Sequence, residues 1–205
     1  MRGAWLSSHV SFNPSPTRQT EETVEIFPAT KYVHAPKKIA ASENGTTFCG
    51  VLEPDLPSFC GCVDAPYGGT LNCTVAITAG GVTLDTVVVV LDLQPCALPM
   101  YFSFEVTEAA AGVDYKYEIT AGEEEMVPVP YLSVAIPGLG EAGVFMIVDI
   151  DGNIDALTMD IGVDACVDTY GLLTCASTVD PVDFPIWLLE ATYDFGDVCA
   201  TAMLA

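Results

Sequence analysis

The chain has 205 residues, is 51% apolar, and carries a formal charge of -22 from 28 acidic and 6 basic side chains. The large negative charge means that the chain is repelled by nucleic-acid phosphates and by anionic lipid surfaces. The high apolar fraction excludes a disordered acidic tail. No apolar run reaches the roughly 18 residues that a membrane-spanning helix needs, which leaves a globular domain with or without an extension.

Residues 1–48 are predicted to form an extended N-terminal arm. They hold five of the six basic residues and four acidic ones, and their four prolines disfavour a long helix. Residues 23–27 alternate like a strand, with Val24 and Ile26 on one side, but are too isolated to be stable alone. The arm is therefore a linker, an edge strand of its own domain, or a strand donated to a neighbouring subunit.

Residues 49–205 are predicted to form a single acidic domain. They carry one cation, Lys116, against 24 carboxylates, for a charge of about -23, whereas residues 1–48 sum to about +1. β-branched and alternating segments predict strands over 70–78, 82–93, 101–107, 113–120, 144–150, 154–163 and 187–193. Only residues 108–111 have helical composition. Eight or more short strands separated by Gly and Pro predict an all-β fold, a β-sandwich or a partly open barrel.

All eight cysteines lie in this domain, at Cys49, Cys60, Cys62, Cys73, Cys96, Cys166, Cys175 and Cys199. Zinc sites need C-x2-C spacing or histidine partners, and the domain has neither, so we expect disulfides. Their connectivity stays open among 105 pairings, and only Cys166 with Cys175 is predicted, across a short loop. Disulfides imply an oxidising compartment, and sequons at Asn44 and Asn72 agree with a secreted glycoprotein. Residues 1–6 do not resemble a signal peptide, because their apolar stretch is too short.

The segment 149–155 is the sharpest local pattern, with Asp149, Asp151 and Asp155 around Gly152. Alternating oxygen ligands around a glycine suit calcium, although the spacing is not that of an EF-hand. The same letters also predict a two-residue hairpin turn at Asp151-Gly152, and the two interpretations are compatible. No other cofactor is expected.

No catalytic constellation stands out, and we expect a protein that is not an enzyme. Both histidines lie in the arm, so the acidic domain has no base for a serine or thiol nucleophile. The many carboxylates do not single out a pair for glycoside hydrolysis.

Charge segregation instead predicts a secreted structural protein. Its arm, through Val24, Ile26, Tyr32 and Val33, would join the β-domain of the next copy in a head-to-tail filament. The partners would be other copies of the chain and covalent glycans, without nucleic acid or a membrane span. Two alternatives stay open: a salt-adapted protein whose charge only confers solubility, and a binding module for a small apolar ligand or a glycan. The ligand pocket of such a binding module would be lined by aromatic residues of the strands: Tyr101, Phe102, Phe104, Tyr115, Tyr117, Trp187 and Tyr193.

Overall fold

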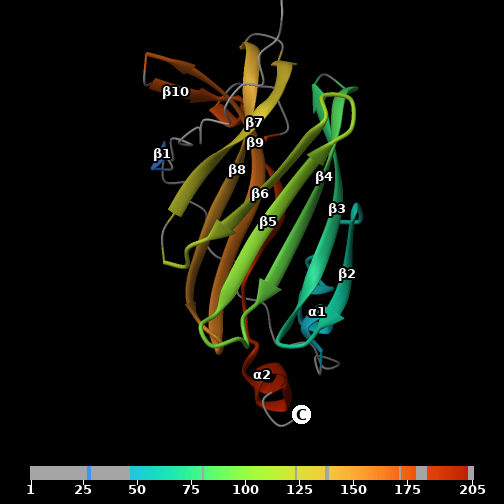
Figure 1. Ribbon diagram of the computed structural model, residues 1–205, viewed down its shortest axis with the longest axis vertical. Helices are drawn as coiled ribbons and strands as arrows, with labels where there is room; N and C mark the ends of the chain where they lie inside the picture. The colour runs from blue at the N-terminus through green and yellow to red at the C-terminus, as the bar shows by residue number, and fades with distance from the viewer. Residues whose placement is uncertain are drawn as a thin grey trace, which may run out of the picture.

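Two antiparallel sheets lie face to face in the computed structural model, which describes residues 27–28, 47–79, 81–122, 124–136, 139–170, 172–178 and 184–202 (Figure 1). The all-β prediction is confirmed. The described elements are β1 (Phe27–Pro28), α1 (Phe48–Leu52), β2 (Cys60–Ala65), β3 (Gly68–Ala79), β4 (Val82–Gln94), β5 (Tyr101–Glu108), β6 (Val113–Ile119), β7 (Glu124–Ile136), β8 (Gly140–Asn153), β9 (Ala156–Thr169), β10 (Leu172–Cys175), η1 (Ala176–Thr178), β11 (Ile186–Tyr193) and α2 (Gly196–Ala202).

The topology is close to a simple meander. Strands β2 to β6 follow one another across a five-stranded sheet. The chain then passes to a six-stranded sheet in the order β1-β7-β8-β9, where β10 and β11 both pair with β9 along different parts of its length. In Figure 1 the five-stranded sheet lies in front of the six-stranded one, and α2 lies at the lower end near the C-terminus.

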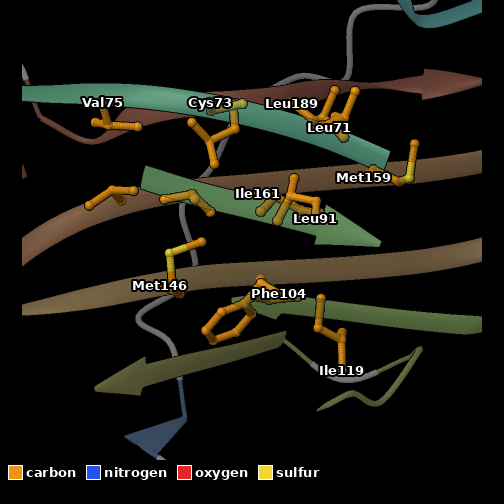
Figure 2. Packing of buried hydrophobic residues seen from close by; sticks show 14 of the residues in the cluster. Leu71, Cys73, Val75, Leu91, Phe104, Ile119, Met146, Met159, Ile161 and Leu189 are labelled. Carbon is orange, nitrogen blue, oxygen red and sulfur yellow. The ribbon is translucent and has the colours of Figure 1, made fainter. Parts of the chain in front are cut away.

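The core lies between the sheets because each strand turns alternate apolar side chains inward. In β4 the residues Val87, Val89, Leu91 and Leu93 are all buried, while the residues between them are partly exposed. Figure 2 shows such side chains from both sheets, Leu91 and Ile161 among them, meeting in the interior. Each fully buried residue of this size contributes about 1.5–3 kcal/mol, so this layer supplies most of the stability.

Strand β7 was not predicted from the sequence. It carries Pro128 and Pro130, which suggested an interruption, but it lies near the edge of its sheet, where proline is tolerated. Residues 108–111, which have helical composition, instead end β5 and form a turn, in which Glu108 accepts hydrogen bonds from the Ala110 and Ala111 amides.

All eight cysteines form disulfides, as predicted. The pairs are Cys49–Cys62, Cys60–Cys73, Cys96–Cys199 and Cys166–Cys175, and the last is the pairing expected from the sequence. The first joins α1 to β2, the second joins β2 to β3, and the third joins the β4–β5 connection to α2. Four disulfides indicate a protein of an oxidising compartment.

Candidate functional site

Two residues of the arm lie on the edge of the six-stranded sheet. Phe27 pairs with Met126 and Pro28 with Glu125, so β1 extends the sheet beyond β7 in antiparallel fashion (Figure 1). Met126 lies on the face of the sheet that is turned away from the core. The other predicted arm contacts, Val24, Ile26, Tyr32 and Val33, lie outside the described residues, as does Asn44.

A second apolar cluster covers that outer face of the six-stranded sheet, and we call it the outer cluster. Its members come from β7, β8, β9, β10 and β11: the buried Met126, Phe145, Ile147, Cys166 and Cys175, with the partly buried Leu173 and Trp187. Met126 and Ile147 are each only 1% exposed. The sequence signal for this cluster is the unbroken apolar run 144–148 in β8, which is typical of a strand covered on both faces.

Acidic residues share the outer face with this cluster. The strand registers place Glu124, Asp149, Asp151, Asp160, Asp164, Asp168 and Glu190 on it. Asp164 is fully buried beside the Cys166–Cys175 disulfide, and its Oδ1 accepts from the Ala165 amide at 2.7 Å and the Ser177 amide at 3.4 Å. A carboxylate oxygen of Asp164 and the two sulfurs lie within 4.8 Å of one another, close enough to share a metal ion. The sulfurs are bonded to each other, however, and so offer no thiolate ligand.

The outer face of the five-stranded sheet has a different character. Asn72 and Thr74 of β3 are exposed there, and Glu105 of β5 lies opposite Lys116 of β6. Such a polar face is stable in water without a cover. The sequon residue Asn72 is thus accessible, and its opposite residue in β2 is Gly61, which has no side chain.

The predicted calcium residues lie in the β8–β9 hairpin. Its tip is Ile154-Asp155 rather than Asp151-Gly152, because Gly152 is paired with Leu157 inside the ladder. At Gly152, φ is +108°, and a Cβ atom would come within 2.1 Å of the Ala156 carbonyl oxygen, so this glycine serves close strand approach and not the turn. Asp149, Asp151 and Asp155 do not form a three-ligand cluster among the described residues. Calcium binding at this hairpin stays a prediction.

A cavity of about 430 Å³ lies at the end of the sandwich where the arm joins the acidic domain of residues 49–205, which we call the body. It is enclosed by α1, the β2–β3 turn and α2, with Phe48, Tyr67, Val198 and Ala202 in its wall. Phe48 stacks on Phe195, with ring centroids 5.1 Å apart, which fixes the inner wall. The aromatic residues proposed to line a ligand pocket do not line this cavity, and Phe102 and Phe104 are buried in the core instead.

Tyr193 is a buried titratable group whose pKa is strongly perturbed. Burial, followed by the negative charges of Asp55 and Asp160, raises its pKa well above the ordinary value of 10.0. Within the described part of the chain its hydroxyl has no hydrogen-bond partner, and neither does Oδ2 of Asp55. Burial also raises the pKa of Tyr115. Both shifts link the free energy of unfolding to pH in the alkaline range.

No protein-family model matches the chain, and no curated protein or solved structure matches it either. None of the helices in the described residues has the length and apolar character needed to cross a membrane. Function has to be inferred from the arm, the β7 edge and the outer face of the six-stranded sheet.

Proposed function

We propose that this protein is a secreted, non-enzymatic structural subunit that polymerises head to tail. The N-terminal arm of one subunit adds as a strand to the β7 edge of the next. The observation that carries the proposal is the pairing of Phe27 and Pro28 with β7, since it identifies an edge that accepts this arm. An edge that accepts the chain's own segment accepts the identical segment of another copy equally well, which is the principle of strand exchange.

The register supports a specific role for the alternating arm residues. Continued by three residues beyond Phe27, the ladder would set Ile26 opposite Val127 and Val24 opposite Val129. Val127 and Val129 are buried core residues, so Ile26 and Val24 would project to the core side of the sheet. Thr23 to Phe27 would then contribute apolar side chains to both faces. Pro128 and Pro130 donate no backbone hydrogen bonds, so side-chain burial has to supply most of the affinity.

Chain length permits exchange between subunits. Residues 29–46 separate the paired Pro28 from Thr47, the first residue of the continuous body. Eighteen extended residues span up to about 60 Å, enough to reach a neighbouring domain. Because the arm enters at one place on a subunit and leaves from another, the contact is heterologous and generates an open filament unless the rotation closes a ring.

Charge favours the same contact. The body carries about -23 and the arm about +1 with five cations, so two bodies repel while an arm and a body attract. The four disulfides and the sequons at Asn44 and Asn72 support a secreted, glycosylated subunit.

A second candidate function is a binding module for a small apolar ligand or a glycan. The cavity between α1 and α2 favours it, because about 430 Å³ lies within the range of small-molecule sites. A protein of this class would stay monomeric at every salt concentration.

The decisive experiment compares arm variants of the full chain by electron microscopy and light scattering. Ile26→Asp would place a charge against the buried Val127 and should abolish filaments. Ser15→Asp adds the same charge outside the strand pattern and should leave them intact. Filaments formed by a chain lacking residues 1–40, or by Ile26→Asp, would overturn the proposal. So would a full chain that remains a monodisperse monomer, a result that would favour the binding module.

A further inference from the structure

The outer cluster is buried on a face that the sandwich core does not cover. Side chains that stand on one face of a sheet shield each other only partly, and an antiparallel sheet normally leaves one face to solvent. Met126 and Ile147 are nevertheless 1% exposed, and Phe145 is 6% exposed. The partly buried hydrophobic residues that pack against the cluster in the described part of the chain are Leu173 and Trp187, both on its β10 and β11 side. A further layer of chain over this face would account for burial this deep.

The arm reaches this face at a known point. Phe27 is paired with Met126, a member of the outer cluster. Lys31 follows Pro28 by three residues, about 10 Å along an extended chain. Two strand spacings of about 4.8 Å separate β1 from β8, and a third separates β8 from β9. A chain that continues from Pro28 across the sheet would therefore bring Lys31 to β8, beside Asp149 and next to Asp160 of β9.

Charge on the two surfaces is complementary. Seven carboxylates occupy the outer face of the six-stranded sheet. The one cation of residues 49–205, Lys116, lies on the other sheet opposite Glu105. The arm supplies Lys31, Lys37 and Lys38 together with the apolar Tyr32 and Val33. Cationic residues on either side of an apolar pair match a face on which carboxylates surround an apolar patch.

We infer that the outer face of the six-stranded sheet is the docking surface of the N-terminal arm, which crosses from β7 towards β11 over the outer cluster with its lysines on the acidic residues. This inference extends the proposed function from a strand edge to a sheet face. It rests on that proposal only for the identity of the copy that supplies the arm. The polar outer face of the five-stranded sheet is left free for solvent and for a glycan on Asn72.

Zero-length carbodiimide cross-linking of the full chain tests the docking surface, because the chain has only four lysines, three of them in the arm. Lys31, Lys37 and Lys38 should link to the outer face of the six-stranded sheet, at Asp149, Asp160, Asp168 and Glu190. Lys116 serves as the internal control and should link to its own neighbours on the five-stranded sheet. Arm lysines that link equally to Glu105 and Glu118, or that do not link to the body while Lys116 reacts, would overturn the inference.

Mixing unlabelled and 15N-labelled protein before assembly identifies the copy that supplies the arm. Cross-links between differently labelled chains support both the surface and the exchange of arms. Cross-links within one label alone support the surface and contradict the proposed assembly, so the two failures are distinguishable.

Fluorescence gives an independent readout, since the chain has two tryptophans and one of them, Trp187, packs against the outer cluster. In a Trp5→Phe background, changing Lys31, Lys37 and Lys38 to Glu should shift Trp187 emission to longer wavelength and increase its quenching by acrylamide. Changing the same lysines to Arg keeps the charge and should leave both signals unchanged. Identical spectra for the Glu and Arg variants would count against the docking surface.

Discussion

The two disulfides at opposite ends of the sandwich differ greatly in the length of chain that they close. Cys96–Cys199 joins residues separated by 103 positions, and Cys166–Cys175 joins residues separated by 9. All four cysteines are buried, at 4% exposure or less. Replacing either pair by alanine therefore removes two buried sulfurs in both variants, and the packing losses are similar. The remaining difference lies in the unfolded chain.

Loop-closure entropy gives the size of that difference. The chain-entropy relation predicts a loss of about 4.7 kcal/mol for the Cys96→Ala/Cys199→Ala variant at 25 °C. For Cys166→Ala/Cys175→Ala it predicts about 2.6 kcal/mol, so the long-range pair should cost about 2 kcal/mol more. Part of this constraint is felt locally, because Cys199 joins α2 to the β4–β5 connection and Phe195, just before α2, stacks on Phe48 of α1.

Urea unfolding without reductant measures both losses, with two-state fits to the unmodified chain and the two variants. The m-values should rise in both variants, and more in the Cys96→Ala/Cys199→Ala variant, because an unfolded chain without the cross-link is less compact. Equal losses of stability, or a larger loss for Cys166→Ala/Cys175→Ala, would refute the entropic reasoning. The second outcome would mean that the outer cluster depends on its disulfide for packing rather than for chain constraint.

Three further predictions follow from single residues. Because the pKa of Tyr193 is raised, the native state keeps a proton that the unfolded chain loses above pH 10. The resulting contribution to the free energy of unfolding is complete below pH 10 and falls by up to about 1.4 kcal/mol per pH unit above it. The Tyr193→Phe variant should therefore show a smaller fall in the free energy of unfolding between pH 9 and pH 11. An equal fall in the variant and the unmodified chain would contradict this reasoning. Gly162→Ala should cost about 1–3 kcal/mol in urea unfolding, because its Cβ would lie 2.7 Å from the Trp187 ring. Gly143→Ala, with 3.4 Å to Phe145, is the matched control, and equal losses would exclude a steric cause. In a glycosylating host Asn72→Gln should remove one glycan by mass spectrometry, and an unchanged mass would exclude modification there.

Strands with regular alternation were predictable from the sequence, whereas β2, β7 and β10 were not. The β-branched run 82–93 became β4 because every second residue had an apolar place in the core. β7 was missed because Pro128 and Pro130 read as breaks, although an edge strand needs no donor on its open side. In the β8–β9 hairpin the sequence suggested a turn at Gly152, whereas that glycine permits close approach of Ala156.

The outer cluster was not predicted. Alternation in a strand shows which residues share a face of the sheet, but it does not show whether a second face is also covered. The run 144–148 signalled a strand buried on both sides, yet its outer neighbours come from β7, β9, β10 and β11. Only the strand order brings Met126, Phe145 and the Cys166–Cys175 disulfide onto one surface. The disulfide pairing across the short β9–β10 loop, by contrast, was predictable because nearby chain positions limit the alternatives.

Charge segregation and the two unlike sheet faces lead to one account of assembly. Two bodies at about -23 repel over distances comparable to the Debye length, about 10 Å at 0.1 M salt, so bare body-to-body contact is disfavoured. An arm with five cations approaches the same body under attraction, and the acidic outer face of the six-stranded sheet directs it there. Once docked, the arm is held by strand pairing and by apolar contact with the outer cluster, which act at short range and are little screened. Salt should therefore slow filament growth without dissolving filaments already formed, because electrostatics governs the association rate more than the stability of the docked state.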